Sequence, residues 1–318
     1  MFAEAFKITV AAVIQILLLA ALGYFLKKKN ILTDTGLDAL SHLVINVTLP
    51  ILIFVQLNRD FNFSIYPNWW IFPLLSFVIT ALALVVGLIF IGVIRGGQKK
   101  LQFLSLVTFQ NSGYLPLALF AALLPAYKAG AMFIYLFLFL IGFNLIMWPL
   151  AVYILSFSKK TEFEFNNLFN PPVIAALLGI TAVFLGLNKF IPNLVLKPFK
   201  LVGDCTVPLA MFVVGADLAK IKVGHFDKNS MFWLVLVKLV ILPILGLWLV
   251  LKFRFPELIG LLILIQLAVP PATSLSVIIR HYKKEDLLIS QGIFFGHILS
   301  IITIPVFLSL YFSRVMIK

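Results

Sequence analysis

Runs of consecutive apolar residues, each about 20 residues long, recur along the whole chain and most constrain its fold. A helix of that length crosses the hydrocarbon core of a bilayer and satisfies its own backbone amides and carbonyls. Alternation of apolar and polar residues is not sustained anywhere, which argues against a membrane β-barrel. We therefore expect an all-helical, polytopic membrane protein with about ten spans. The spans are expected at 8–26, 37–57, 69–94, 101–124, 129–156, 171–187, 201–218, 231–251, 258–279 and 287–312.

The composition supports this class of protein. Of the 318 residues, 62% are hydrophobic and 12% are charged, which is too little charge to cover the surface of a soluble protein. The net charge of +13 is high enough to suggest a nucleic-acid partner. The Lys and Arg residues lie instead in short loops between the apolar runs, where such residues orient membrane helices. We therefore expect the lipid bilayer as the surroundings of the chain and no nucleic-acid partner.

Residues suited to catalysis or metal binding do not form a recognisable motif. The chain contains no nucleophile elbow, zinc-protease helix or P-loop. Its single cysteine, Cys205, excludes an internal disulfide and has no neighbours with metal-ligand spacing. We expect no enzyme activity, no catalytic residues, no metal site and no cofactor. Any transport would be secondary, facilitated or dependent on a separate subunit.

The first apolar run is followed at once by Lys27, Lys28 and Lys29. A cleaved signal peptide carries its basic residues before the apolar segment, so this run is expected to remain as a helix. Basic residues prefer the cytoplasmic side, which places the N-terminus outside. The chain is thus expected to be a multi-pass protein of the plasma (inner) membrane with its N- and C-termini outside.

The apolar run 101–124 is expected to contain a helix break. Pro116 has no amide hydrogen, its ring crowds the carbonyl of Ser112, and Gly113 weakens the same turn. The break also carries four polar side chains, from Gln110, Asn111, Ser112 and Tyr114.

A second break is expected in the run 258–279, where Pro270 and Pro271 leave the carbonyls of Gln266 and Leu267 without their helical donors. Two broken helices at corresponding places are typical of a transporter's binding site. The alternative is that each break is a proline kink satisfied by neighbouring helices.

The two halves of the chain contain similar segments. Residues 46–55 and 204–213 share Thr, Pro, Phe and Val in register, and Asn46 corresponds to Asp204. The interval from Pro50 to Pro208 equals that from Ser112 to Pro270, so the two breaks correspond as well. Because each half has an odd number of spans, the second half would be inverted relative to the first. The predicted organisation is a first repeat at 1–156, a short cytoplasmic loop at 157–170 and a second repeat at 171–318; chance similarity is the alternative.

The breaks are the candidate substrate site. Free backbone amides at the amino ends of half-helices carry partial positive charge, which suits a carboxylate, and Asn111 adds a polar side chain. The substrate-binding candidates are Gln110, Asn111, Ser112, Gly113, Tyr114, Pro116, Val269, Pro270, Pro271 and Ala272.

Among the charged residues of the predicted spans, the candidates for coupling or charge compensation are Asp204 and Lys238. An uncompensated carboxylate at mid-bilayer costs about 2.5 kcal/mol or more, so Asp204 is a candidate protonation site, cation ligand or partner of a buried base. Asn46 is its uncharged counterpart. Lys238 could attract an anionic substrate or pair with Asp204. The alternatives are that Asp204 lies near the outer interface and that Lys238 has only a structural partner. The residues interpreted as forming hydrogen bonds between helices are Asn144, Gln266, Gln291 and His297. Gly292 and Gly296 have the spacing of a small-xxx-small motif, which predicts close helix packing.

The chain resembles the auxin efflux carrier family over nearly its whole length. The motifs that carry the resemblance are residues 46–50, 110–113, 269–272 and 300–305. The resemblance implies a fold shared with bile acid–sodium symporters, with ten helices in two inverted five-helix repeats. Spans 1, 2, 6 and 7 would form a scaffold that is often dimeric. Spans 3–5 and 8–10 would form a mobile transport domain, with the two breaks crossing at its centre.

In the plant members of that family, the substrate carboxylate meets an asparagine at the first crossover, and Asn111 matches this position. Their long cytoplasmic loop, the site of regulation by phosphorylation, corresponds here only to 157–170, so that regulation is not expected. Span 3 holds no acidic residue, unlike its plant counterparts, which makes Asp204 the substitute to test.

The expected function is therefore an efflux carrier of small organic anions, working as a secondary transporter by an elevator-type or rocking mechanism. A sodium-coupled symporter of the bile acid type, a non-transporting membrane sensor and a channel are the alternatives. The substrate, the direction of transport and the coupling ion are left open.

Overall fold

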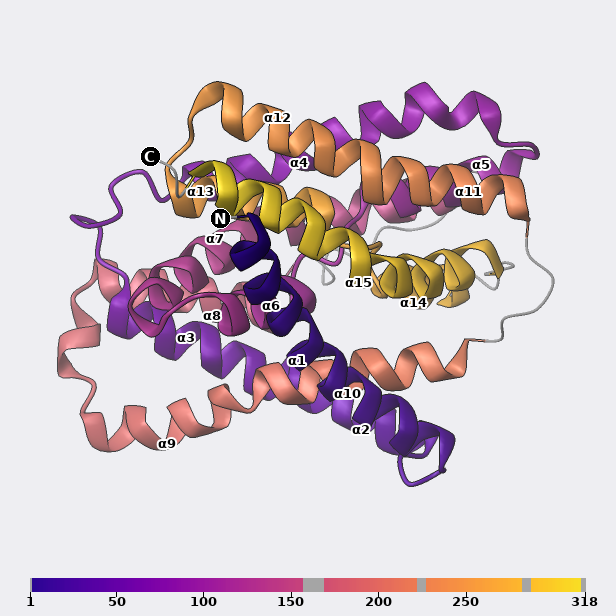
Figure 1. Ribbon diagram of the computed structural model, residues 1–318. Coiled ribbons are helices and arrows are strands. Elements are labelled where there is room, and N and C mark those ends of the chain that lie inside the picture. The colour runs from indigo at the N-terminus through magenta and orange to yellow at the C-terminus, as the bar shows by residue number, and fades with distance from the viewer. Residues whose placement is uncertain (1, 157–168, 222–226, 282–286, 316–318) are drawn as a thin grey trace.

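The computed structural model describes residues 2–156, 169–221, 227–281 and 287–315, and Figure 1 shows these residues as a set of packed helices. Within them the only β-type pairing is an isolated antiparallel bridge between Gln110 and Pro271. The all-helical prediction is confirmed. Most of the predicted cytoplasmic loop, residues 157–168, lies outside the described residues.

Seven helical segments of the described residues are long and apolar enough to cross a bilayer: Phe2–Lys28, Asp34–Asp60, Ile71–Val93, Ala126–Leu155, Asn193–Lys220, Lys228–Phe253 and Leu287–Val315. Three shorter apolar helices are Tyr114–Leu123, Pro171–Phe184 and Glu257–Ala268. Two of these three belong to the runs that were predicted to be broken. The prediction of a polytopic helical membrane protein is thus confirmed, with the membrane-crossing length shown for seven segments.

The elements follow the predicted runs closely. In chain order they are α1 (Phe2–Lys28), α2 (Asp34–Leu43), η1 (Val44–Thr48), α3 (Leu49–Asp60), α4 (Ile71–Phe90), η2 (Ile91–Val93), α5 (Gly97–Thr108), α6 (Tyr114–Leu123), α7 (Ala126–Ser156), α8 (Pro171–Phe184), η4 (Leu187–Phe190), α9 (Asn193–Asp204), α10 (Thr206–Lys220), α11 (Lys228–Leu236), η5 (Val237–Ile241), α12 (Leu242–Phe253), α13 (Glu257–Ala268), α14 (Ser274–His281) and α15 (Leu287–Val315).

Two of the long helical segments contain a π-helical turn directly before a Leu-Pro pair. The turn η1 precedes Pro50 in α3, and η5 precedes Pro243 in α12. A proline has no amide hydrogen and its ring crowds the preceding turn, so a helix that continues through it must widen or bend there. The π turns let both segments remain continuous across their prolines.

One group of helices is built around the contact of α1 with α10, and α3 packs against α8 and α9. The α1–α10 contact depends on glycine, because a Cβ at Gly23 would overlap the backbone of Phe212, and one at Gly215 would overlap that of Ala20. The chain therefore needs a residue without a side chain at both positions.

The second group of helices lies beside the first in Figure 1. In it α4 packs against α5 and α7, α13 packs against α12 and α15, and α15 also contacts α5 and α11. The groups meet where α7 contacts α3 and α8, and at the junction of α1 and α10 with α6 and of α1 with α15. This junction lies beside the two helix breaks.

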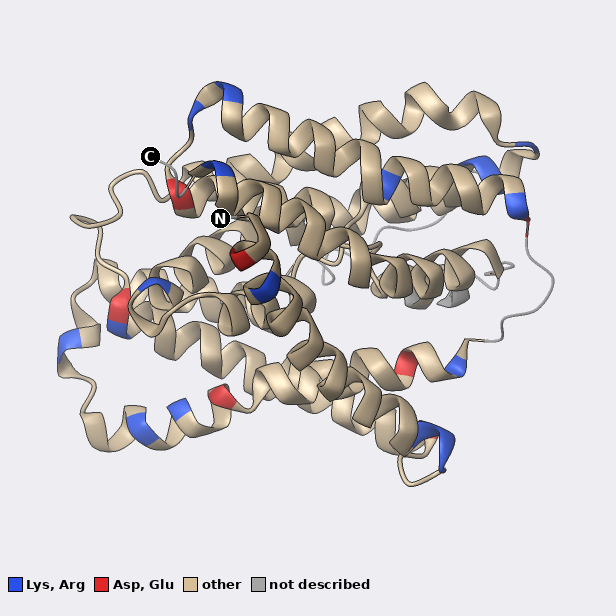
Figure 2. Ribbon diagram, viewed as in Figure 1, with Lys and Arg blue, Asp and Glu red and all other residues tan. Residues whose placement is uncertain are grey.

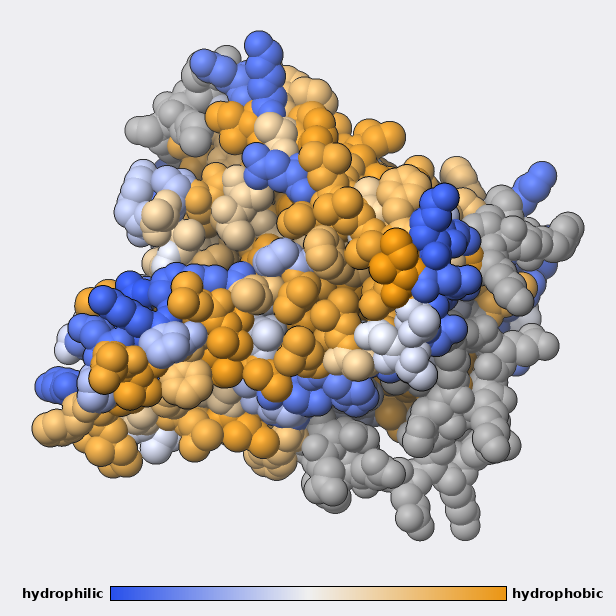
Figure 3. Space-filling view, turned by 90° about the horizontal axis from the view of Figure 1, so that it is seen from below, coloured by the Kyte–Doolittle hydropathy of each residue, from blue (hydrophilic) through white to orange (hydrophobic). Residues whose placement is uncertain are grey.

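The surface has the character expected of a membrane protein. Large apolar side chains such as Phe190 and Leu194 are more than four-fifths exposed, and Figure 3 shows apolar residues over much of one face of the molecule. Charged residues gather mainly toward helix ends and connections (Figure 2). A bilayer would cover the apolar surface that water would not tolerate at this extent.

Candidate functional site at two broken helices

The first predicted break is present between α5 and α6. Phe109, which follows α5, has the extended backbone angles φ −102° and ψ 112°. Pro116 lies in the first turn of α6, where its missing amide would have no helical acceptor in any case. Because Ser112 lies outside the helix, the expected crowding of its carbonyl by Pro116 is avoided. Pro116 therefore begins the second half-helix and does not bend a continuous one.

The second predicted break is present between α13 and α14. Val269 is extended at φ −71° and ψ 149°, and its amide donates to the carbonyl of Ile265 at 2.9 Å. Pro270 and Pro271 follow and prevent the helix from continuing. The side chains of Val269, Pro270, Pro271 and Ala272 are all buried.

The two breaks pair with each other. The amide of Asn111 donates to the carbonyl of Pro270 at 2.9 Å, and the amide of Ala272 donates to the carbonyl of Phe109 at 3.0 Å. Each break thus supplies backbone partners that the other lost when its helix was interrupted. The amide of Ser112 donates to the carbonyl of Gln110 at 2.8 Å. The amides of Asn111, Ser112 and Ala272 are therefore engaged with protein carbonyls, so the expectation that such amides are free for substrate is corrected at these three positions.

The side chain of Asn111 contacts a histidine from the far end of the sequence. Asn111 Nδ2 lies 3.2 Å from His297 Nε2, and His297 Nδ1 lies 2.8 Å from the carbonyl oxygen of Ile293. Asn111 is 5% exposed and His297 is 7% exposed. The histidine was interpreted as a link between helices, and its partner lies instead in the break between α5 and α6, at the centre of the candidate site. The sequence did not indicate Asn111 as the partner of His297, because a single histidine in an apolar helix carries no pattern that identifies its partner.

Glycine at position 296 explains how α15 comes so close to the breaks. A Cβ there would lie 2.7 Å from Pro271 Cδ, and one at Gly292 would lie 2.7 Å from Leu106 Cδ1. The close helix packing predicted from these two glycines is confirmed. It brings His297, the residue after Gly296, to Asn111.

Several buried polar atoms at the breaks have no hydrogen-bond partner among the described residues. They include both polar side-chain atoms of Gln110, Ser112 Oγ and Gln266 Oε1. Gln266 Nε2 does donate, at 3.2 Å, to the carbonyl of Ser112. An unpaired buried polar group costs about 1–3 kcal/mol, so this set of atoms is suited to a polar ligand, water or an ion.

Lys238 lies in the π-helical turn η5 and is only 1% exposed. Its Nζ donates to the carbonyl of Val107 at 2.9 Å, in the last turn of α5. In an unbroken helix the amide of Asn111 would donate to that carbonyl, but the break directs this amide to Pro270. The ammonium group replaces the lost donor and places a positive charge at the carboxyl end of the half-helix, which the helix dipole favours.

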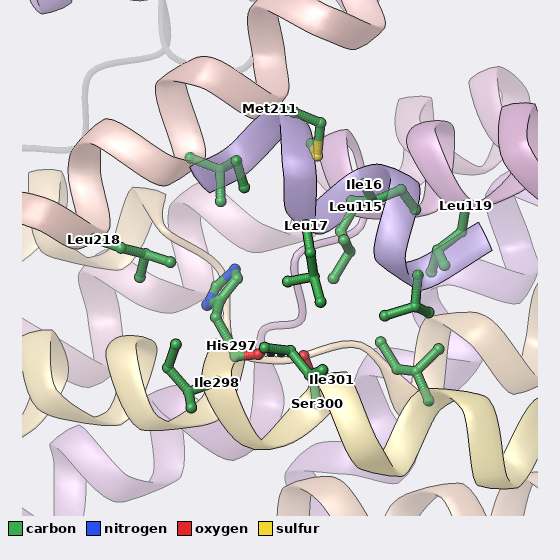
Figure 4. Close-up of a pocket in the computed structure, with 14 residues that line it drawn as sticks. Ile16, Leu17, Leu115, Leu119, Met211, Leu218, His297, Ile298, Ser300 and Ile301 are labelled. Carbon is green, nitrogen blue, oxygen red and sulfur yellow. Dashed lines mark hydrogen bonds between the residues drawn. The ribbon is translucent and has the colours of Figure 1, made fainter. Parts of the chain in front are cut away.

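A cavity of about 60 Å³ lies where the two groups of helices meet (Figure 4). Residues of α1 and α10, including Leu17 and Met211, form one wall, and residues of α6 and α15 form the other. His297 and Ser300 are the polar members of an otherwise apolar lining. The volume is enough for a few water molecules. His297 therefore connects the paired breaks with an apolar space between the helix groups.

Comparison with known proteins shows the family of this chain. Residues 8–308 match the family model described as "Membrane transport protein". The chain belongs to this family, the auxin efflux carriers. An uncharacterized transporter of Methanocaldococcus jannaschii is 25% identical over 318 residues, which cover 92% of this chain and 95% of the relative. One of Methanothermobacter thermautotrophicus is 24% identical over 301 residues, with the same shares covered.

Plant proteins are also similar to part of this carrier. Protein PIN-LIKES 1 of Arabidopsis thaliana is 25% identical over 166 residues, which are 47% of this chain and 34% of the plant protein. Proteins of this family are membrane transporters and not enzymes. The resemblance inferred from the sequence motifs is confirmed.

Two residues proposed from the sequence lie apart from this cluster of contacts in the carrier. Asp204 forms an ion pair with Lys200 at 2.6 Å, and its side chain is about half exposed. Asn46 Nδ2 lies 3.2 Å from His42 Nδ1 on the exposed side of its helix. The suggested pairing of Asp204 with Lys238 is corrected, because the structure pairs the carboxylate with Lys200 and the lysine with Val107. One helical turn separates Lys200 from Asp204, so a local partner was available.

Proposed function

We propose that this carrier is a secondary transporter that exports small organic anions, and that the substrate carboxylate binds at the paired breaks. The observation that carries the proposal is the meeting of two buried helix breaks at Asn111, beside a cavity between two helix groups. Matched broken helices near the middle of a transporter fold are the usual location of its substrate site.

Three features of the site favour an anion. The side-chain amide of Asn111 has N–H donors, and the helices α6 and α14 begin at the breaks, so their partially positive ends are near. The ammonium group of Lys238 lies one turn before Asn111 along the chain, at the Val107 carbonyl. In surroundings of low dielectric constant such a charge acts over several ångströms. The remaining candidates at the breaks, from Gln110 to Pro116 and from Val269 to Ala272, would shape the site.

The lining of the adjacent cavity favours one class of carboxylate. Apart from His297 and Ser300 the lining residues are apolar, and none of them is Lys or Arg. A second carboxylate on the substrate would find no basic partner there and would be costly to bury. A monocarboxylate with an apolar body therefore suits the cavity better than a dicarboxylate. The present volume of about 60 Å³ would have to increase to admit a bulky one.

Alternating access would require the two helix groups to move relative to one another. The inverted repeat predicted from the sequence, with units 1–156 and 171–318, would provide them: α1–α3 and α8–α10 as the scaffold, and the other helices as the transport domain. In the predicted repeat, α1 corresponds to α8 and α10 corresponds to α3. The α1–α10 contact therefore corresponds to the α8–α3 contact, and the packing supports the symmetry because both contacts are extensive. We further propose that the transport domain makes an elevator-type movement and that two copies of the chain form a homodimer through the scaffold. The chain would lie in the plasma membrane with both termini outside.

A sodium-coupled symporter is the second candidate. The unpaired oxygens of Gln110, Ser112 and Gln266 favour it, because hard cations prefer neutral and anionic oxygen ligands. Sodium would then add to the binding of the anion.

A thermal-shift screen of the purified carrier against carboxylates tests both candidates. The ligands would be butyrate, benzoate, malonate, malate, 2-oxo acids and indole-3-acetate, each with and without sodium. A ligand that binds only the folded state stabilises it by about 2.7 kcal/mol at 100 times its Kd.

We expect a shift with monocarboxylates that Asn111→Ala abolishes while its own melting temperature stays near that of the wild type. An unchanged affinity in Asn111→Ala would contradict the assignment of the site. A shift that requires sodium would favour the symporter.

A further inference from the structure

We propose that His297 takes up a proton when the substrate anion binds, and that the side-chain amide of Asn111 couples the two events. This inference rests on the proposed function, because it assumes that a carboxylate meets Asn111. It adds the identity of the coupling ion and of the residue that carries it.

The hydrogen bonds define the state of the histidine in the structure. The carbonyl oxygen of Ile293 can only accept, so His297 Nδ1, at 2.8 Å, carries the ring hydrogen. In the neutral ring, Nε2 then has a lone pair and accepts from Asn111 Nδ2 at 3.2 Å. Both side chains are more than nine-tenths buried, so water has little room to replace either bond.

This arrangement makes Asn111 a poor receptor for an anion. An amide group presents its nitrogen and its oxygen in opposite directions. While one N–H of Nδ2 donates to His297, only the second N–H is left for a carboxylate, and Oδ1, directed away from the ring, would repel one that approached it. Neutral His297 therefore holds Asn111 in the orientation that disfavours substrate.

Protonation of His297 reverses the preference. With a hydrogen on Nε2, the ring would direct a donor at the donor of Asn111, and the amide must turn so that Oδ1 accepts from Nε2. The turned amide then directs Nδ2 to the substrate carboxylate. The charges of the imidazolium and the carboxylate also compensate each other in the buried site, which lowers the cost of burying both.

The proton balance is simple. Water on the side from which the substrate enters supplies one proton, which forms the Nε2–H bond, and no bond of the anion changes. When the anion leaves on the other side, that bond breaks and the proton returns to water. One proton therefore accompanies each monocarboxylate, and the transport cycle moves no net charge.

The surroundings leave His297 as the group best placed for this exchange, because it is the one titratable residue among those that line the cavity. From η5, which packs against α15, Lys238 is directed to the Val107 carbonyl. From α13, Glu257 contacts Tyr311 with its carbonyl, about 21 Å along α15 from His297, and its carboxylate pairs with Lys128. The other charged residues that α1, α5, α11 and α12 bring toward α15 lie at helix ends; they are Glu4, Lys7, Lys27, Lys28, Lys99, Lys100, Lys228 and Lys252.

Two further groups come from the opposite side of the cavity. Tyr114 begins α6, and Asp217 of α10 precedes the lining residue Leu218. Neither contributes to the lining itself.

The chain contains its own control pair. His42 and Asn46 make a second contact of a histidine ring nitrogen with an asparagine Nδ2, also at 3.2 Å, but both residues are exposed. Because no protein atoms enclose that asparagine, it can turn without a change in the charge of the ring. The variants to compare are therefore His297→Gln and His42→Gln. Glutamine can keep a hydrogen bond to asparagine and cannot take up a proton near neutral pH.

The first measurement is of proton uptake when butyrate, benzoate or indole-3-acetate is added to the purified full-length carrier in weak buffer with a pH indicator. The second is of the Kd of each acid between pH 5 and 8. We expect about one proton per bound anion in the wild type and in His42→Gln, and a Kd that rises up to about tenfold per pH unit above the titration range of His297. His297→Gln should still bind, with no proton uptake and a Kd independent of pH. Melting temperatures show whether each variant folds. If His297→Gln does not fold, His297→Asn takes its place.

The outcomes separate the two proposals. Binding by the wild type without proton uptake, or the same uptake in His297→Gln, would overturn the coupling and leave the carboxylate site intact. No binding of any of the three acids at any pH would overturn the carboxylate site and the coupling together.

Discussion

The two helix breaks of this carrier both begin with a residue of extended backbone, Phe109 and Val269, but they carry different side chains. The break between α13 and α14 runs from Val269 to Thr273, and its one polar side chain is that of Thr273, directly before α14. The break between α5 and α6 contains Gln110, Asn111 and Ser112 in a row, all buried. They are joined by the hydrogen bonds from Asn111 to Pro270 and from Ala272 to Phe109.

This difference indicates that the second break supports the backbone of the first, whereas the first break recognises the ligand. Prolines remove amide donors permanently, so the second break cannot return to a helix and presents a stable carbonyl to the first. The first break uses that carbonyl for its backbone and keeps its side chains for His297 and for a ligand. Changes at the second break should therefore act on folding, and changes at the first should act on binding.

The largest effect is expected where α15 packs on the second break. Gly296→Val would place side-chain atoms against Pro271, which a Cβ would already approach to 2.7 Å. Overpacking of this kind costs about 1–3 kcal/mol, and it would also move His297 away from Asn111. Thermal unfolding and substrate binding should both decline. Gly97→Ala is the control, because a Cβ there meets nothing within 4 Å; an equal loss in both variants would refute the packing argument.

Removal of the Lys238 ammonium should weaken anion binding more than folding. Lys238→Met leaves the Val107 carbonyl unpaired, which costs about 1–3 kcal/mol, but it also removes a buried charge whose desolvation was costly. These two effects have opposite signs in the free energy of unfolding. The lost charge and the altered end of α5, in contrast, both weaken the binding of a carboxylate. We expect a melting temperature close to that of the wild type and a Kd at least about tenfold higher by thermal shift or calorimetry. Lys252→Met, which changes a lysine stacked on Trp248, should leave the Kd unchanged.

A smaller effect is expected at the second break itself. Pro270→Ala keeps the carbonyl that accepts from Asn111 and adds only an amide. The change in unfolding free energy should be about 0.4–1 kcal/mol, mostly through the greater freedom of the unfolded chain. The substrate Kd should not change, in contrast to Asn111→Ala. If Pro270→Ala lost affinity as strongly as Asn111→Ala, the division into support and recognition would be wrong.

The smallest effects are expected at the ion pairs that hold the far ends of the two half-helices. Lys99 near the start of α5 pairs with Asp227 at 2.8 Å, and Glu257 at the start of α13 pairs with Lys128 at 2.7 Å. Exposed pairs of this kind contribute less than about 1 kcal/mol. Asp227→Asn and Glu257→Gln should therefore lower the melting temperature slightly, and less so at high salt.

The Asp227 pair also has a pH dependence of known sign. The hydrogen bond from Lys99, followed by that from the Ser230 amide, lowers the pKa of Asp227 below its ordinary value. A lowered folded-state pKa stabilises the protein above the unfolded-state pKa of about 3.9, and this contribution is lost as pH falls through the folded-state pKa. The difference between wild type and Asp227→Asn should thus be present at neutral pH and vanish in acid. A difference that persists in acid would show that the side chain acts by other means.

Much of the architecture was predictable because the bilayer imposes simple rules. Apolar runs of sufficient length must be helical there, so the spans agree with the helices to within a few residues, except where α1 and α9 begin earlier than the first and seventh predicted runs. The breaks were predictable because Pro116, Pro270 and Pro271 lack amides. Gly292 and Gly296 likewise indicated close packing before their neighbours were known.

The partners of the polar residues were not predictable in the same way. Asp204 looked buried because its surroundings in the sequence are apolar, but it lies on an exposed side of its helix, next to Lys200. Lys238 was recognised as buried, yet its acceptor is a carbonyl far along the chain, and no sequence pattern marks a carbonyl freed by a distant break.

The sequence by itself thus determined that this protein is a helical membrane transporter with two interrupted helices and a polar residue, Asn111, at one of them. These properties follow from hydrophobicity, proline and glycine, which act on the chain locally. Only the tertiary structure decided that the interruptions satisfy each other, that their amides are occupied, and that His297 faces Asn111. Such contacts join residues more than 150 positions apart, and they depend on how whole helices pack, which no local rule specifies.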